Sequence, residues 1–220
     1  MLGSYRGKHV GGFAIAHQKG QKVRWRFVAT EINDKAREDN HQGTPPLMIV
    51  RAIISRAGSR PNKDGKHSRL VRSWDVRKAF FNAPIDELVF VHPGAELCEK
   101  GWCWRLNKAM NGTRKASQLW GEMVKDCWDS SGANILRGVP GTVYFPATSA
   151  EADDDCTVTC HGDDFLAEGV GYILDELSHV LEKHFEVTET GTVGPGYPGD
   201  FLYLKRLVGY TETLPETGLP

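Results

Sequence analysis

Two short apolar runs separated by a single tight turn constrain the fold of this chain more than any other feature. The runs are Cys156–His161 and Phe165–Ala167, and each has the length and composition of a buried strand. Gly162-Asp163-Asp164 joins them, and a connection this short that begins with glycine is typical of a β-hairpin. The pattern predicts an antiparallel pair of strands with two adjacent carboxylates at its tip.

The remaining hydrophobic periodicity predicts an α+β protein. Further strands are expected at Val23–Ala29, Leu70–Val76, Glu87–Val91, Thr142–Phe145, Glu186–Thr188 and Phe201–Val208. Amphipathic helices are expected after Pro46, after Lys115 and over Ile173–Leu181. The order of strand, helix, strands, helix and strand fits a ferredoxin-like split βαβ sheet with both helices packed on one face.

A third carboxylate, that of Asp75, lies in an apolar strand segment, where burying it is energetically unfavourable. Asp75 lies within the apolar segment Leu70–Val76, and burying a carboxylate is unfavourable unless a cation or hydrogen bonds compensate it. Asp163 and Asp164 repel each other, which raises one pKa unless a metal ion lies between them. Oxygen ligands from separate strand ends suit two Mg²⁺ or Mn²⁺ ions, which catalyse phosphoryl transfer. The alternative is structural, with a polar turn at the hairpin and a strand-end cap at Asp75.

The net charge of -1 hides an uneven distribution of charge. Residues 1–30 contain Lys and Arg but no acid, residues 51–78 are mostly basic, and residues 151–189 are strongly acidic. Basic regions of this kind bind a polyanion locally even when the net charge is close to zero. The residues expected to contact a nucleic acid are Arg24, Arg69, Arg72 and Lys205. The alternative is that the basic regions are solvated surfaces.

The cysteines and the hydropathy bear on location. The five cysteines are irregularly spaced, which argues against a disulfide framework and for a reducing compartment. Cys156, Cys160 and His161 have no second ligand pair at zinc-finger spacing. The longest apolar run, over residues 46–57, is interrupted by Arg51, and the start lacks a signal-peptide pattern. We therefore expect an intracellular protein, in the cytoplasm or nucleus, without a membrane partner.

Three ordered motifs carry a family resemblance. Trp74–Asp86 matches the pattern Asp-Val-x-x-Ala-Phe-x-Asn, and Leu106–Trp120 is similar to a segment with Leu-Tyr-Gly-Leu-Lys-Gln-Ala at its centre. His161–Asp164 stands where the same family has an aromatic residue, a variable residue and Asp-Asp. Shorter similarities in the same order occur at Trp25–Ala29, Phe185–Val187 and Phe201–Arg206. Together these segments resemble the reverse transcriptases of copia-type LTR retrotransposons.

The resemblance implies an RNA-directed DNA polymerase fragment of a retrotransposon. Such an enzyme extends a primer on an RNA or DNA template with dNTPs, and two Mg²⁺ or Mn²⁺ ions would be held by Asp75, Asp163 and Asp164. The residues implied to contact the nucleotide are Arg26, Val76, Phe80 and Gly112, with Phe80 beneath the sugar. For Phe80 the alternative is a core position, with Phe81 facing the site instead.

The same resemblance implies a polymerase palm with a partial fingers subdomain. The expected segments are a flexible basic lead-in (1–22), partial fingers (23–68), a palm with the catalytic carboxylates (69–210) and a truncated tail toward the thumb (211–220). The sequence makes no prediction about oligomeric state.

Departures from the family pattern keep other functions open. His161 replaces an aromatic residue, Asn111 replaces a tyrosine, and Ser117 with Leu119 interrupts a usual Gln-Ala-Pro-Arg run. A catalytically decayed remnant that binds nucleic acid is therefore one alternative. Another two-metal enzyme, such as a nuclease or cyclase, would explain the carboxylates but not the segment that contains Gly112 and Trp120.

One further motif is expected to be a loop. Gly194–Gly199 matches the Gly-x-Gly-x-x-Gly pattern of dinucleotide-binding proteins. That fingerprint requires a strand before it and a helix that starts within it, whereas here two prolines intervene and a strand is expected to follow.

Overall fold

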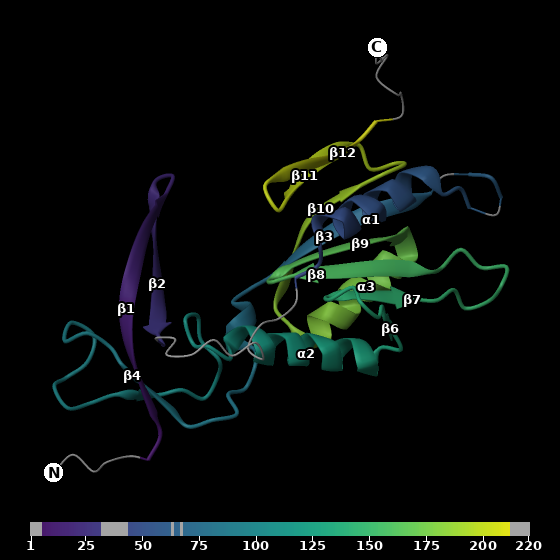
Figure 1. Ribbon diagram of the computed structural model, residues 1–220. Coiled ribbons are helices and arrows are strands. Elements are labelled where there is room, and N and C mark those ends of the chain that lie inside the picture. The colour runs from purple at the N-terminus through teal and green to yellow at the C-terminus, as the bar shows by residue number, and fades with distance from the viewer. Residues whose placement is uncertain (1–5, 32–43, 63, 67, 212–220) are drawn as a thin grey trace. The chain divides into compact units, whose positions relative to one another are not determined.

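The computed structural model in Figure 1 describes residues 6–31, 44–62, 64–66 and 68–211, and the chain forms two units. The first unit contains Met1–Gln42 and Lys78–Val124, and the second contains Gly43–Arg77 and Lys125–Pro220. Each unit is therefore assembled from two stretches that are far apart in the sequence. Helices and antiparallel strands are both present, which confirms the predicted α+β class.

The first unit contains a four-stranded sheet in the order β2-β1-β4-β5. Its strands are β1 (Lys8–Lys19), β2 (Lys22–Thr30), β4 (Val89–His92) and β5 (Trp104–Arg105). β1 pairs antiparallel with β2 and parallel with β4. The buried side chains that pack this sheet are Val10, Ala29, Val89, Val91 and Met110. The strands predicted at Val23–Ala29 and Glu87–Val91 are confirmed as β2 and β4.

Part of the stretch predicted to be irregular and flexible, residues 1–22, is instead a strand, because Lys8–Lys19 forms β1. The glycines in this stretch suggested a flexible backbone, but at Gly12 the missing side chain is needed for packing. A Cβ atom there would lie 2.4 Å from the ring of Phe27. The strand exists because β2 and β4 supply its hydrogen-bond partners, which local sequence does not reveal.

The second unit contains a six-stranded sheet in the order β10-β3-β9-β8-β7-β6, with every neighbouring pair antiparallel. The strands are β3 (Arg69–Val76), β6 (Asn134–Ile135), β7 (Thr142–Phe145), β8 (Cys156–His161), β9 (Asp164–Val170) and β10 (Val187–Val193). The predicted hairpin is β8–β9, and the predicted strands over residues 70–76, 142–145 and 156–161 are confirmed. β6 was not predicted, since two residues carry no periodicity.

Helices cover both faces of this sheet. Helix α1 (Leu47–Ser59) packs Val50, Ile53 and Ala57 against the face that contains Val71 and Leu166. Neighbouring residues along a strand point to opposite faces, so Trp74 and its cross-strand partner Phe165 lie on the other face.

That other face carries the two later helices. Trp74 donates a hydrogen bond to Ser178 of α3 (Gly171–His184), with 3.1 Å between Nε1 and Oγ. Trp128 of α2 (Ala116–Ser130) packs edge-on against Phe165, with 5.7 Å between the ring centroids. Both helices therefore lie on one face, as the split βαβ pattern predicted.

A two-stranded hairpin completes the second unit. It consists of β11 (Gly199–Tyr203) and β12 (Arg206–Tyr210), so the predicted strand segment over 201–208 is divided by a turn. Leu204 and Lys205 form that turn with φ of 47° and 62°, a left-handed conformation that non-glycine residues adopt at a cost. Between β10 and this hairpin, the Gly-x-Gly-x-x-Gly segment is a loop with no helix, as predicted.

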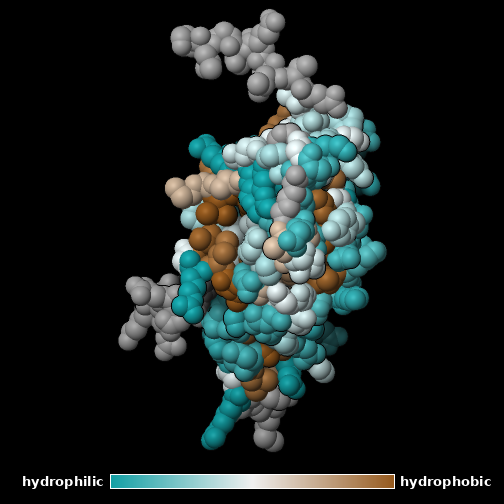
Figure 2. Space-filling view, turned by 90° about the vertical axis from the view of Figure 1, so that its right-hand side faces the viewer, coloured by the Kyte–Doolittle hydropathy of each residue, from teal (hydrophilic) through white to brown (hydrophobic). Residues whose placement is uncertain are grey.

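The surface shown in Figure 2 is mostly hydrophilic, with hydrophobic residues gathered in smaller patches between polar ones. Such a mixture is ordinary for a water-exposed protein surface. In the part of the chain that the structure describes, no helix is both long enough and apolar enough to cross a membrane.

Candidate active site

Three carboxylates meet at one end of the six-stranded sheet. Asp75 near the end of β3 is the direct cross-strand partner of Asp164, the first residue of β9. Directly opposed residues of an antiparallel pair have Cβ atoms about 4.5–5.5 Å apart and lie on the same face. Asp163 immediately precedes Asp164 and belongs, with Gly162, to the two-residue turn between β8 and β9. The structure therefore brings together the three carboxylates that the sequence singled out.

The turn itself is locked to β3. Gly162 takes the left-handed φ of 68° that a hairpin turn beginning with glycine favours. The backbone N–H of Val76 donates to the carbonyl of Asp163 over 2.9 Å, which joins the end of β3 to the turn. Because the Val76 side chain is buried and its N–H is used in this way, the expectation that Val76 contacts a nucleotide finds no support.

A row of polar residues extends from these carboxylates across four strands. Thr188 of β10 opposes Asp75, Asp75 opposes Asp164, and Asp164 opposes His161 of β8. His161 was noted in the sequence only as a departure from the family pattern. Its register places it on the same face as the carboxylates, next to Asp164.

The electrostatics of this row are those of accumulated negative charge. Burial and the charges of Asp163 and Asp75 together raise the pKa of Asp164 to about 6, with the charge of His161 offsetting part of the rise. Asp163 is exposed to solvent, and Asp164 is half-buried. A carboxylate whose pKa is raised by two like charges is stabilised by any cation that binds between them.

The donor chemistry of the site fits a divalent cation, although the side chains are not arranged as a ligand set. Among the residues that the structure describes, no group of three or more His, Cys, Asp or Glu side chains has the arrangement of a metal centre. The three carboxylates nevertheless offer hard oxygen donors from a strand and an adjoining turn. Asp75, Asp163 and Asp164 are thus the residues that would hold such an ion.

The opposite end of the same sheet face carries a buried network of ion pairs. Arg69 of β3 donates to Glu168 of β9 over 2.7 Å and to Asp155 over 3.2 Å. From α1, Arg56 pairs with both carboxylates, and Arg60 donates to Asp155 over 2.6 Å. Burial pushes the pKa of Asp155 upward, but hydrogen bonds from Arg60 and Arg56 and the charge of Arg69 bring it down to about 2.

This network corrects the predicted nucleic-acid contacts of Arg69 and Arg72. The side chain of Arg69 is 1% exposed and is paired with two carboxylates. The side chain of Arg72 is 6% exposed, and its guanidinium bonds Asp175 of α3 over 2.7 Å. Neither the Arg69 nor the Arg72 guanidinium is therefore accessible to a nucleic acid. The partners lie about a hundred residues away in sequence, at a separation of 99 for Arg69 and Glu168, so the basic stretch looked unpaired.

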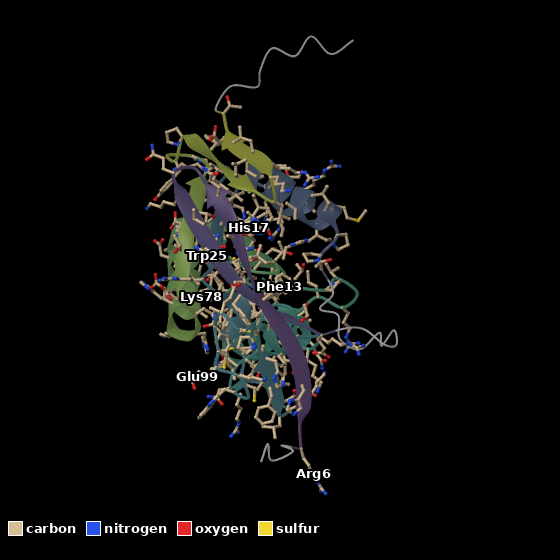
Figure 3. All side chains as sticks on the ribbon, turned by 90° about the vertical axis from the view of Figure 1, so that its left-hand side faces the viewer. Arg6, Phe13, His17, Trp25, Lys78 and Glu99 are labelled. Carbon is tan, nitrogen blue, oxygen red and sulfur yellow. The ribbon has the colours of Figure 1, made fainter. Side chains whose placement is uncertain are left out.

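In the first unit, the β1–β2 hairpin presents exposed basic and aromatic side chains. Arg24 and Arg26 pair in register with His17 and Ile15, so both arginines extend from one face of the hairpin, and both are exposed. Figure 3 shows Phe13, His17 and Trp25 along the two strands, and Trp25 is 69% exposed. The predicted contacts of Arg24 and Arg26 thus remain available to an anionic ligand.

Phe80 and Phe81 follow β3 in the 3₁₀ helix η2 (Ala79–Phe81). Phe80 is half-buried against a cluster of Ala83, Ala109, Ala116 and Leu119. Phe81 is 39% exposed. Phe80 therefore contributes to packing in the first unit and is only partly buried.

Gly112 has a structural role that the sequence did not predict. It adopts φ of 88°, and a Cβ atom on it would lie 1.9 Å from the carbonyl oxygen of Ala29. Its own carbonyl accepts from Glu31, and the neighbouring Asn111 carbonyl accepts from Ala29. The close approach that requires glycine here is to β2 rather than to a nucleotide.

Lys205, the last residue predicted to bind nucleic acid, is exposed at the tip of the β11–β12 hairpin. Tyr203, two residues before it, is buried in the core. The geometry thus supports the carboxylates and the exposed cations, and it removes Arg69, Arg72 and Val76 from the site.

Comparison with known proteins bears on the chemistry of these carboxylates. No curated protein matches the chain. The family model described as reverse transcriptase (RNA-dependent DNA polymerase) matches residues 14–196, which include both strands and the turn that carry the three carboxylates. Members of this family bind a template–primer and a deoxynucleotide and use divalent metal ions. The chain belongs to the reverse transcriptase (RNA-dependent DNA polymerase) family, which confirms the prediction from its motifs.

Proposed function

We propose that the second unit is the palm of a copia-type retrotransposon reverse transcriptase and that the first unit supplies its fingers. These units differ from the expected bounds of 23–68 for the fingers and 69–210 for the palm, because residues 44–68 belong to the second unit and residues 78–124 to the first. The single observation that carries the proposal is the pairing of Asp75 with Asp164 at the end of the sheet, next to Asp163. Asp75 and Asp164 belong to two different family motifs and are almost ninety residues apart in the chain. The pairing of β3 with β9 nevertheless places them opposite each other on one face of the sheet. Their mutual repulsion is the condition that bound cations relieve.

In the proposed reaction, the 3′-oxygen of the primer attacks the α-phosphorus of a dNTP. A new phosphodiester bond forms, the bond to the β-phosphate breaks, and pyrophosphate leaves. Two bound Mg²⁺ or Mn²⁺ ions would activate the attacking oxygen and stabilise the leaving one. The chain's own contribution is to hold Asp75 and Asp164 in register and Asp163 on a turn fixed by the Val76 N–H.

The first unit would bind the nucleotide and template through exposed groups. Arg26 would contact the triphosphate of the incoming nucleotide, and Arg24, on the same face of the hairpin, would contact the nucleic-acid backbone. Lys205 of the second unit is a further candidate for backbone contact. Phe80, which is only partly buried, would lie beneath the sugar and exclude a 2′-hydroxyl by steric clash.

Primer extension on an RNA template with Mg²⁺ or Mn²⁺ tests the proposal. Asp163→Asn should reduce extension by at least about 100-fold, the scale of losing one transition-state electrostatic group. The melting temperature should not fall, since the change removes one member of a repulsive pair. Glu182→Gln, an exposed carboxylate on α3, is the matched control and should extend normally. Wild-type extension by Asp163→Asn would refute the proposal, and template binding without extension by the wild type would indicate a decayed remnant.

The role of the hairpin has its own test. Charge reversal at Arg24 and Arg26 should weaken template binding and make the slope of log affinity against log salt shallower by roughly 0.7–0.9 per lost phosphate contact. Reversal of Arg137, an exposed arginine of the second unit, serves as the control. Salt dependence that is unchanged in the hairpin variants would exclude them from the interface.

A further inference from the structure

The sheet of the first unit is built from strands without acidic residues. Its four described strands, β1, β2, β4 and β5, contain no Asp or Glu, although acidic residues slightly outnumber Lys and Arg in the whole chain. Glu31 and Glu87, which flank these strands, pair with Lys8. A surface of this composition attracts anionic ligands, because its cations have no carboxylate neighbours within the same strands.

The strand register gathers exposed rings and cations on one face of this sheet. Directly opposed residues share a face, as do residues two positions apart along a strand. Ile15 of β1 opposes Arg26 of β2, so Arg26 lies on the same face as Phe13. His17 opposes Arg24 on that face as well. The exposed members of this face, which we call the open face, are His9, Phe13, His17, Arg24, Arg26 and Arg105.

The opposite face buries the core of the unit. Val10 and Ala29, two of the core residues, occupy positions that alternate with those of the open face. Trp25 lies on that opposite face too, because it opposes Ala16. Figure 3 shows Phe13 on β1 and Trp25 on β2. The hairpin therefore presents an exposed ring on each face, and of the two only Phe13 shares its face with the arginines.

Phe13 provides a stacking surface on the open face. The residue is 47% exposed in the middle of β1. Arg26 is its diagonal neighbour across the β1–β2 pair, about 7–8 Å away between Cα atoms. An aromatic ring beside a cation binds unpaired nucleotides, because a base stacks on the ring while the cation holds a phosphate. A base within a duplex has both faces covered, so such a surface selects single strands.

The other end of the open face offers a second ring surface. The Nδ1 atom of His9 and the Nε2 atom of His92 lie 2.8 Å apart, which joins two exposed imidazoles. The His9 ring also stacks on Phe90, with 5.2 Å between the ring centroids, and Phe90 opposes Arg105 of β5. His9 and Phe13 are four residues apart in β1, so roughly 13 Å separates the two surfaces. The open face can therefore hold more than one nucleotide of an extended strand.

We propose that the open face binds single-stranded nucleic acid, with an unpaired base stacked on Phe13 and the phosphates of the same strand held by the surrounding cations. The inference rests on the proposed function for its role in the reaction, where the bound strand would be the unpaired template. Stacking tolerates any base, because every base has a π-face, and a template-directed enzyme must accept every sequence. The competing occupant is an acidic protein segment, which would use the cations but not the ring.

Fluorescence anisotropy with a labelled oligouridylate, in EDTA, measures this contact without catalysis. Phe13→Ala should weaken binding about fivefold to a hundredfold, the scale of one lost base stack. Phe13→Leu, which keeps an apolar side chain, should weaken binding similarly, whereas Phe13→Tyr should bind as the wild type does. The slope of log affinity against log salt should not change in Phe13→Ala, because no cation is lost. Wild-type affinity in the Ala and Leu variants, or a wild type that does not bind, would overturn the proposal.

Two controls separate stacking on this face from general attraction. Trp25→Ala removes an exposed ring from the opposite face of the same hairpin and should leave the affinity unchanged. An oligomer of abasic sugar-phosphate units carries the same charge without bases, and it should bind the wild type no better than oligouridylate binds Phe13→Ala. An equal loss in Trp25→Ala would overturn the assignment to the open face. Equal affinity of the wild type for both oligomers would show recognition of charge alone, as for an acidic protein segment, and would overturn the proposal.

Primer extension by the same proteins separates this inference from the proposed function. If the wild type extends a primer but Phe13→Ala binds single strands normally, only the stacking inference fails. If the wild type extends no primer but binds oligouridylate in a Phe13-dependent way, the proposed polymerase fails and the binding face stands.

Discussion

The two ends of the β3–β9 ladder carry carboxylates in opposite electrostatic states. Glu168 and Asp164 belong to the same strand and face, four residues apart, and each lies beside a residue of β3. Around Glu168 and Asp155, three arginines bring cationic partners. Around Asp164, the neighbouring charges are mainly the carboxylates of Asp75 and Asp163. One end is neutralised within the protein, and the other accumulates negative charge.

The pKa values express this difference. The pKa of Asp155 falls to about 2, because the hydrogen bonds from Arg60 and Arg56 outweigh the effect of burial. The pKa of Asp164 rises to about 6, because burial and two like charges act together. A carboxylate of the first kind stabilises the fold, whereas one of the second kind destabilises it unless a ligand brings positive charge. Burial alone therefore does not identify the functional carboxylates, and the sign of their surroundings does.

The largest expected effect concerns the neutralised end. Asp155→Ala should lower the free energy of unfolding by about 3–5 kcal/mol, because it leaves Arg69 buried without one of its partners. Since the pKa of Asp155 is depressed, its contribution is present above about pH 4 and is lost as the pH falls toward 2. Urea denaturation measures the change, with the exposed Glu151→Ala as control. A loss below about 1 kcal/mol would remove the contrast between the two ends.

At Asp164 we expect a substitution to have the opposite effect on stability, because negative charge accumulates around this carboxylate. Because its pKa is raised to about 6, the folded state holds more protons than the unfolded state between about pH 4 and pH 6, and stability falls as the pH rises through that window. Asp164→Asn should therefore stabilise the metal-free protein by about 1–2 kcal/mol at pH 8, after allowance for solvent screening, and not at pH 4. Thermal melting in EDTA measures both. Destabilisation at pH 8 would mean that the carboxylate is compensated after all.

A smaller effect should come from adding the cation itself. Mg²⁺ at about five times its Kd should raise the free energy of unfolding of the wild type by roughly 1 kcal/mol at pH 8. In Asp163→Asn the increase should be much smaller, because a ligand is missing. Glu168→Gln should respond as the wild type does, although its starting stability is lower. An equal response in all three proteins would place the bound ion elsewhere.

The sequence predicted those features of the fold and the site that can be recognised from neighbouring residues along the chain. β7 and β8 begin and end at the predicted residues, because buried apolar runs end at turn residues. The carboxylates were predicted because Asp75 interrupts an apolar strand and because two aspartates share a tight turn. Each of these two signals is contained within a few residues of the carboxylate that it concerns.

The errors came from contacts that are distant in the sequence. Arg69 and Arg72 read as free cations because their carboxylate partners lie on strands and a helix about a hundred residues away. β1 read as flexible because its glycines are explained only by the packing of β2 against it. Gly112 read as a nucleotide contact, but the carbonyl that fills the space beside it belongs to Ala29.

The central claim is that β3 and the β8–β9 turn form one catalytic site. The most direct measurement is the single-turnover rate of nucleotide addition for Asp75→Asn, Asp163→Asn and the double variant. Each single change should reduce the rate by at least about 100-fold, and the double variant should lose little more, because residues that act as one unit give non-additive losses. A single variant with the wild-type rate, or losses that multiply in the double variant, would contradict the claim.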